Sequence, residues 1–387
     1  MTPLSSQLTN SRIESPDQIK IDPLTRLPGM FDFDYILKHL HGGDIINLSF
    51  VSKSWNFVVH NSREYMNKTK VRIDYSKTSS RRPKQSELKL IKKNPKRFQN
   101  FDFSCQHNQI ISQECLNIIN IFRETIVELI LQEMVEVDTE FIGDIWLPNL
   151  KVLKLKSTNE KPCYQLFNSC RNLEVVHFDC IYDESILDCL YKNPNIYDIK
   201  FSNDVFESIF HNDPLDDFPF KISSFTSLAW KTDQMTEFSF IQFLSKQTFS
   251  LTRLKLFYAS HKMIEFIYNE LDIINVVDIK YFETCRSIDE TFDPIPKNNE
   301  ITEINLHHNV LLVGIRAMIK AAPKLKVLRV KFINKTIVEF VTVLCKNLRL
   351  LIYCYDMDKS EELYKVLIRN TRTEVNRKII LKCTNFQ

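Results

Sequence analysis

Residues 150–155 read Leu-Lys-Val-Leu-Lys-Leu, with leucine at the first, fourth and sixth positions. Apolar residues occupy these three positions repeatedly along the chain, and successive copies begin 23 to 29 residues apart. The eleven copies start at residues 98, 126, 150, 173, 196, 225, 251, 274, 301, 325 and 348. A repeat of this period predicts a solenoid, in which each unit packs against the units before and after it.

Leucine-rich repeats have this length and carry this spacing on a strand, so the chain resembles that type of repeat from residue 98 onward. The asparagine that usually follows the strand is mostly missing. Several units open with Pro or Cys, as in the cysteine-containing subtype, and the cysteines are interpreted as small buried packing residues. These opening residues are Pro148, Cys170, Pro194, Pro323 and Cys345.

Between the strands the apolar spacing changes from two residues to 3.6, which predicts amphipathic helices. The clearest stripes are Cys115/Ile118/Ile119/Phe122, Ile264/Ile267/Tyr268/Leu271, Ile315/Met318/Ile319/Ala322 and Ile337/Phe340/Val341/Leu344. The predicted fold class for residues 98–387 is therefore an α/β horseshoe of about eleven repeats. Its parallel sheet lines the concave side and its helices line the convex side.

Composition excludes several classes of active site. Lys and Arg together number 51 and Asp and Glu 48, so a net charge of +3 gives no general basic excess. The chain has five glycines, which form none of the glycine motifs of nucleotide-binding loops or nucleophile elbows. Its ten cysteines form no C-x-x-C pair. We expect no catalytic residue, no cofactor and no metal site.

A second pattern lies ahead of the repeats. Ile36 and Leu40 fall on one helical stripe, Gly42-Gly43 interrupts it, and Ile45 and Leu48 begin another. A helical module of under 50 residues is too small to bury much core by itself. It must therefore lean on the next domain or on a partner.

These residues resemble an F-box. The matching positions are Leu27, Pro28, Ile36, Leu40, Asp44, Ile45, Leu48, Val51, Ser52, Lys53 and Trp55. The spacing from Leu40 to Trp55 matches without a gap, whereas Gly29-Met30 stand where an acidic residue commonly follows Leu-Pro. Followed by the repeats, this module makes the chain similar to the F-box/leucine-rich-repeat proteins along most of its length.

In that family the F-box docks on the Skp adaptor, the adaptor joins a cullin, and the repeats hold a protein substrate for ubiquitination. The resemblance implies a non-catalytic substrate receptor that acts by proximity. It implies adaptor contacts by Leu27, Pro28, Ile36, Leu40, Ile45, Leu48, Val51 and Trp55. The alternative is that these apolar residues form an intramolecular core that caps the solenoid, and both interpretations can hold together.

The concave face supplies candidate substrate-binding residues. Strand side chains alternate between faces, so the second, fourth and sixth residues after each unit's first apolar residue face the concave side. The candidates are Lys154, Lys200, Lys231, Arg253, Lys255, Phe257, Lys280 and Arg329. Such a basic stripe suits an acidic or phosphorylated peptide. The alternative is a set of solvated lysines.

We predict four segments: a disordered polar tail (1–22), the F-box (23–66), a basic linker (67–97) and the solenoid with its C-terminal cap (98–387). The basic run at 77–97 is either a nuclear-import or phosphate-binding patch or a solvated linker. Because aromatic residues are not interleaved with it, nucleic acid is disfavoured. The absence of a secretory or membrane-spanning segment predicts a cytoplasmic or nuclear protein without a membrane partner.

Two other functions remain open from the sequence. One is a repeat scaffold that binds a partner without a ligase. The other is a binder of an anionic ligand or nucleic acid that uses the basic residues.

Overall fold

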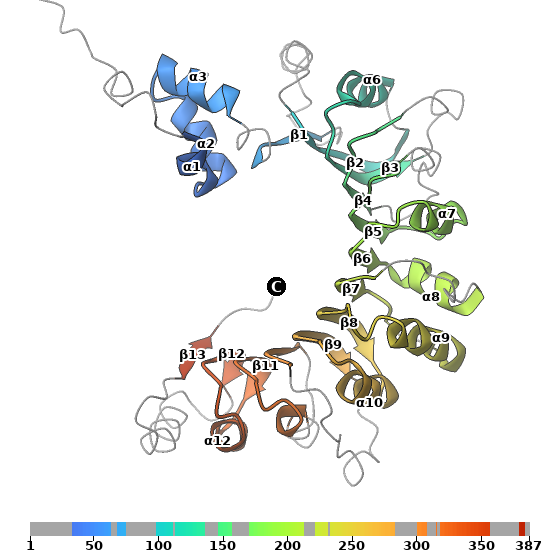
Figure 1. Ribbon diagram of the computed structural model, residues 1–387, viewed down its shortest axis with the longest axis vertical. Coiled ribbons are helices and arrows are strands. Elements are labelled where there is room, and N and C mark those ends of the chain that lie inside the picture. Colours follow the sequence, from blue (N-terminus) through green and yellow to red (C-terminus); the bar gives the residue numbers. More distant parts are fainter. Residues whose placement is uncertain are drawn as a thin grey trace, which may run out of the picture. The chain divides into compact units, whose positions relative to one another are not determined.

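The computed structural model describes residues 33–62, 68–74, 98–110, 113–135, 146–156, 170–212, 221–230, 233–282, 300–307, 315, 318–356 and 379–383. The chain divides into two compact units, Met1–Thr69 and Lys70–Gln387. Each unit has an apolar core of its own. Figure 1 labels most of the helices and strands of both units.

The described part of the first unit contains helices α1 (Phe33–Lys38), α2 (Gly42–Ser49) and α3 (Lys53–Asn61). Leu37, Ile45 and Val59, one from each helix, are fully buried and form the core. The hydroxyl of Ser52 accepts a hydrogen bond from the backbone N–H of Trp55 at 3.1 Å. This bond caps the N-terminus of α3, where the first backbone N–H groups have no partner within the helix.

Lys68 closes the first unit by a long-range contact. Its ammonium donates to the backbone carbonyls of Leu37 at 3.1 Å and Leu40 at 2.9 Å, and also to that of Lys38. A cation is favourable there because the carbonyls at the C-terminus of a helix carry partial negative charge. The end of the first unit is thereby tied to the end of α1.

The second unit is built on a 13-stranded sheet whose strand order follows the sequence. Every pairing between neighbouring strands is parallel. The strands are β1 (Lys70–Asp74), β2 (Asn100–Ile110), β3 (Glu128–Val135), β4 (Val152–Lys156), β5 (Val175–Asp179), β6 (Asp198–Phe201), β7 (Ser224–Ser227), β8 (Arg253–Ala259), β9 (Val276–Phe282), β10 (Glu303–Leu306), β11 (Val327–Ile333), β12 (Leu350–Asp356) and β13 (Ile380–Cys383). This sheet confirms the predicted α/β solenoid.

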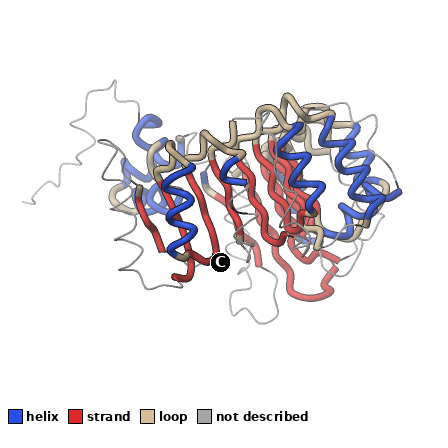
Figure 2. Tube along the Cα trace, turned by 90° about the horizontal axis from the view of Figure 1, so that it is seen from below, coloured by secondary structure: helices blue, strands red, loops and turns tan. Residues whose placement is uncertain are grey.

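The helices between the strands lie along one face of the sheet (Figure 1, Figure 2). They are α6 (Gln113–Phe122), α7 (Ser185–Tyr191), α8 (Asn203–Asn212), α9 (Gln234–Ser245), α10 (His261–Glu270) and α12 (Lys335–Leu344). The helices predicted at α6, α10 and α12 are confirmed, and residues 315 and 318–320 are helical as expected. The stripe on α10 is buried as predicted, whereas α12 buries Val338 and Thr342 and leaves Phe340 and Leu344 only partly buried. The opposite face of the sheet, which carries the concave positions, is called the open face below.

The centre of the helix-covered face is aromatic. Phe206 and Phe210 on α8, Phe225 on β7 and Phe240 and Phe243 on α9 are all buried. The centroids of their contacting rings lie 4.7 to 6.4 Å apart. Tilted and edge-on ring pairs of this kind add to the free energy gained by burial.

The structure corrects the start of the solenoid. Residues 70–74, which the sequence analysis assigns to the linker, form β1 and pair with β2 from Lys70↔Asn100 to Asp74↔Ser104. Val71 and Ile73 are buried on the core face, so this strand keeps the two-residue alternation without the full repeat motif. The predicted tail at 1–22 and the basic run at 77–97 lie outside the described residues. The predicted C-terminal cap contains β13.

The structure also corrects the repeat that was placed at residue 225. Phe225 pairs with Leu254 and Ser227 with Leu256, so the unit's motif is Ile222/Phe225/Ser227, three residues earlier than predicted. Ile222 and Phe225 are fully buried, whereas Trp230, expected inside the repeat, is 65% exposed. The apolar Leu228 and Trp230 matched the motif by chance, because the true third core position holds a serine.

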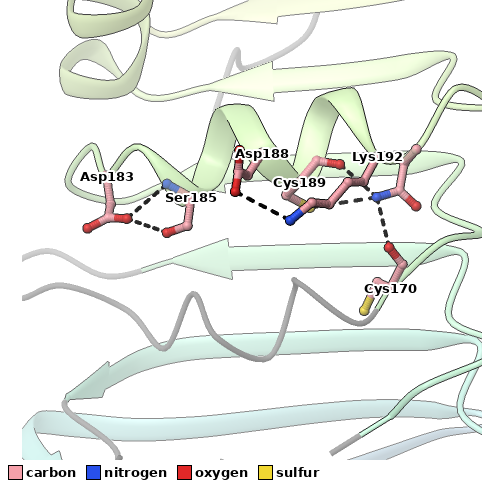
Figure 3. Close-up of polar contacts among 7 residues, drawn as sticks. Cys170, Asp183, Ser185, Asp188, Cys189 and Lys192 are labelled. Atoms are coloured by element: carbon pink, nitrogen blue, oxygen red, sulfur yellow. Dashed lines mark hydrogen bonds and ion pairs between the residues drawn. The ribbon is translucent and has the colours of Figure 1, made fainter. Parts of the chain in front are cut away.

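A buried amide closes the unit of β5. Asn193, which follows α7, accepts a hydrogen bond from the backbone N–H of Leu173 at 3.0 Å. Its amide nitrogen donates to the carbonyl oxygens of Cys170 at 3.1 Å and Cys189 at 2.7 Å. Figure 3 shows the two cysteines and the polar contacts around α7 (Figure 3). Cys170 and Cys189 are buried, as expected for packing residues, and burial raises the pKa of the Cys189 thiol.

Gln247 plays the same part in the unit of β7. Its side-chain Oε1 accepts from the backbone N–H of Ile222 at 3.0 Å. Gln247 follows α9 as Asn193 follows α7, and Ile222 opens its unit as Leu173 does. The matching bonds support the corrected register independently of the strand pairing. In these two units an amide after the helix therefore satisfies a backbone N–H just ahead of the strand.

Candidate protein-interaction surfaces

The first unit buries some of the residues proposed for adaptor binding and exposes others. Ile45 is fully buried in the core, so it supports the module and does not offer a contact surface. Val51 is 64% exposed. Ile36, Leu40, Leu48 and Trp55 are partly buried, and Leu40, Leu48 and Trp55 pack against the core. Leu27 and Pro28 lie outside the described residues.

Two phenylalanines on this unit were missed by the sequence analysis. Phe50, in the turn after α2, is 79% exposed, and Phe57, on α3, is 70% exposed. Trp55 and Val59 lie on the side of α3 that faces the core. Phe57 falls between them in sequence and therefore lies on the opposite side of the helix. Large apolar side chains exposed together on a small module mark an interaction surface.

On the open face of the second unit, strand pairing brings four of the eight candidate residues into one row. The row runs across consecutive strands through Arg72, Asp102, Ile130, Lys154, His177, Lys200, Thr226, Lys255, Asp278, Asn305, Arg329 and Ile352. Four of the predicted basic residues therefore share a level on the sheet. Neighbouring strands in the row are about 4.8 Å apart.

Most of these basic residues are paired with acids. Lys154 lies 2.9 Å from Glu128, Lys200 3.9 Å from Asp179, Lys255 3.7 Å from Asp278, and Arg329 3.5 Å from Glu303. Each pair joins side chains of adjacent strands. The stripe is therefore a set of cross-strand ion pairs rather than a continuous cationic surface. Lys231 lies outside the described residues.

These contacts determine the ionisation of two acidic side chains, Glu128 and Asp278. Burial by itself raises the pKa of Glu128, but its bonds to Lys154 and the charge of Lys70 outweigh that effect and hold the pKa below its ordinary value. Burial likewise raises the pKa of Asp278. The contact with His307, at 2.9 Å, and the charge of Lys255 outweigh this effect and hold the pKa of Asp278 below its ordinary value. Both carboxylates are thus charged near neutral pH.

His177 has the opposite environment. Burial lowers the pKa of its imidazole, and the nearby charges of Lys154 and Lys200 lower it further, while Asp198 and Glu128 act in the other direction. The row places His177 directly between Lys154 and Lys200. The neutral imidazole separates two cations at the middle of the open face.

At the carboxyl ends of β7, β8 and β9 three rings form what we call the aromatic site. The rings of Trp230 and Phe257 have centroids 4.2 Å apart, and Tyr281 lies 4.9 Å from Phe257 and 6.1 Å from Trp230. Phe257, expected to be an exposed apolar candidate, is only 8% exposed because these neighbours cover it. Lys280 places its ammonium 4.4 Å from the centroid of the Phe257 ring.

Over the part of the chain that the structure describes, no three His, Cys, Asp or Glu side chains gather in a group that could hold a metal ion. Within the same residues, no helix has both the length and the apolar character needed to cross a bilayer.

Comparison with known proteins identifies one part of the chain. Residues 34–67 match the family model of the F-box domain, which confirms the F-box expected from the motif residues. No curated protein matches the chain. A solved protein from Bacteroides fragilis has 12% sequence identity and a TM-score of 0.27 over 77% of this chain and 68% of its own.

A chain of the Toll–Spätzle complex of Drosophila has 13% identity and a TM-score of 0.30 over 74% of this chain. This chain spans 33% of that one. At these TM-scores neither solved structure assigns a function.

Proposed function

We propose, from the F-box domain at residues 34–67 and the repeat solenoid that follows it, that this chain is the substrate-recognition subunit of a Skp–cullin–F-box ubiquitin ligase. The F-box match carries the proposal. The chain itself performs no chemistry in this role. It holds a protein substrate near the ubiquitin-charged enzyme, and the gain in rate comes from a raised effective concentration.

Adaptor docking would use the apolar side chains that the first unit leaves accessible. Val51 and Phe57 are exposed, whereas Leu37, Ile45 and Val59 hold the helices together. Leu27, Pro28, Ile36, Leu40, Leu48 and Trp55 complete the surface implied by the F-box motif. Burial of large apolar side chains at the centre of an interface commonly supplies most of its binding energy.

The second unit would hold the substrate on its open face, in the leucine-rich-repeat manner. Cross-strand ion pairs neutralise Lys154, Lys200, Lys255 and Arg329, so a purely electrostatic ligand such as nucleic acid finds few unpaired cations there. A protein substrate suits a mixed polar and aromatic face better. Such ligases work in the cytoplasm and nucleus, which is the location we propose.

The test is co-purification of the recombinant Skp adaptor and its cullin with the intact chain. Val51→Asp and Phe57→Asp should abolish adaptor capture, because both side chains are exposed and neither belongs to the core. Phe249→Asp is the matched control, since Phe249 is equally exposed in the second unit and should not affect capture. An intact chain that captures no adaptor would contradict the proposal and leave a repeat scaffold without a ligase.

A further inference from the structure

One ring of the aromatic site, that of Trp230, is exposed while a hydrogen bond fixes its backbone. Trp230 is 65% exposed, so most of its indole faces solvent. Its backbone N–H donates to the side-chain oxygen of Asn203 at 2.8 Å, and its ring packs at a tilt against that of Phe257, with centroids 4.2 Å apart. Packing does not require a tryptophan here, because the core of this unit is filled by Ile222 and Phe225. A large ring that is held in place before binding loses little entropy when a partner covers it.

The charge around the aromatic site is unbalanced. The described open-face positions of β7, β8 and β9 include three basic residues, Arg253, Lys255 and Lys280, and one acid, Asp278. Asp278 already pairs with Lys255. Arg253 and Lys280 have no acidic partner among the described residues, and both are exposed. This stretch of the sheet differs from the strands on either side, where the candidate cations are neutralised.

The unpaired charge lies beside the rings. Leu256 pairs with Ile279 and Tyr258 with Tyr281, which places Lys280 opposite Phe257 on the neighbouring strand. Lys280 is also 4.4 Å from the Phe257 ring centroid and 6.0 Å from that of Tyr281. An apolar platform and a cation therefore stand side by side, within the reach of two nearby side chains of one extended peptide.

We infer that the aromatic site binds an extended segment of a substrate protein in which an aromatic residue lies within two positions of Asp or Glu. The aromatic side chain stacks on Trp230 and the carboxylate pairs with Lys280. The ring gives most of the affinity, and the carboxylate fixes the direction of the segment. This inference rests on the proposed role as a substrate receptor and names the site and the chemistry of the segment.

The test is a selection of random ten-residue peptides displayed on phage against the full chain. The inference expects enrichment of an aromatic residue within two positions of Asp or Glu. A synthetic peptide with the enriched sequence should bind Trp230→Ala and Lys280→Glu about tenfold more weakly or worse, measured by fluorescence polarisation. Trp146→Ala and Lys326→Glu are the controls, because both residues are exposed in the second unit away from the aromatic site.

A selection that enriches nothing, that enriches sequences without the aromatic–acid pair, or that yields peptides bound equally by Trp230→Ala would overturn the inference. Adaptor capture is measured on the same preparations. Loss of peptide binding with capture retained then concerns the aromatic site, whereas failure of capture by the intact chain concerns the proposed function. The two failures are therefore distinguishable.

Discussion

The backbone N–H of Ile222 donates to the side-chain oxygen of Gln247 at 3.0 Å, and this bond spans the unit of β7 from its first core residue to the end of its helix. The unit of β5 has the same closure between Leu173 and Asn193. Both amides are almost completely buried. The closure therefore contributes to stability in a way that can be measured at one residue.

Asn193→Ala should lower the free energy of unfolding by about 2–4 kcal/mol, because it leaves one backbone N–H and two carbonyls short of a partner in the interior. Urea unfolding followed by circular dichroism checks this value. The matched control is Asn172→Ala. Asn172 is exposed and makes one side-chain bond, to the Pro148 carbonyl, so its loss should cost less than about 1 kcal/mol. Equal losses for the two variants would contradict the role assigned to Asn193.

Phe225→Ala should destabilise the second unit by about 3–5 kcal/mol, because Phe225 is fully buried among the rings of α8 and α9. The control is Phe249→Ala, whose side chain is exposed and whose effect should stay within about 0.5 kcal/mol. The urea unfolding midpoints of the two variants, each compared with that of the wild type, measure these losses of stability. A small effect at residue 225 would contradict the packing of Phe225 among the rings of α8 and α9.

Glu128→Gln should lower the free energy of unfolding by about 1 kcal/mol at pH 7. The reason is that Glu128 lies 3.2 Å from Lys70 and 2.9 Å from Lys154 and so links β3 to two other strands. The pKa of Glu128 is held below its ordinary 4.5. The stabilisation is thus complete above pH 4.5 and is lost as the pH falls through the folded-state value. Wild type and variant should converge in stability below that range, and a constant difference down to the acid limit would contradict this.

His177→Asn should reduce the loss of stability on mild acidification. The pKa of His177 is lowered from 6.5 in the folded chain, so below pH 6.5 the unfolded chain takes up the proton more readily. Stability of the wild type therefore falls as the pH drops from 6.5, and part of that fall should vanish in the variant. Urea midpoints at pH 8 and pH 5.5 provide the comparison. If the stability of both proteins falls equally between pH 8 and pH 5.5, His177 does not contribute to the loss of stability in acid.

The repeat strands and most helices could be predicted because apolar spacing directly reflects which face is buried. β1 escaped prediction since it has only the alternating pair Val71 and Ile73. The register of β7 was misjudged because Ser227 occupies a core position while the exposed Trp230 completes a false motif. Periodicity cannot detect a polar residue in the core or an apolar residue outside it.

The candidate site was harder to predict than the fold. Strand alternation placed Lys154, Lys255 and Arg329 on the open face correctly, because the face depends only on parity. Their neutralisation depends on which side chains stand opposite on the next strand, and that requires the register of both strands. The exposure of Phe50 and Phe57 likewise depends on how three short helices pack, which one amphipathic stripe does not determine.

The strict strand order of the sheet has a mechanical consequence. Among the described strands, each pairs only with its neighbours in sequence, so no hydrogen-bond ladder between them ties distant strands across the solenoid. Tension applied to the two ends of the second unit would be borne by one strand pair after another. Under load the unit would lengthen in steps of one repeat, and on release each repeat could re-form on the edge of the last intact one.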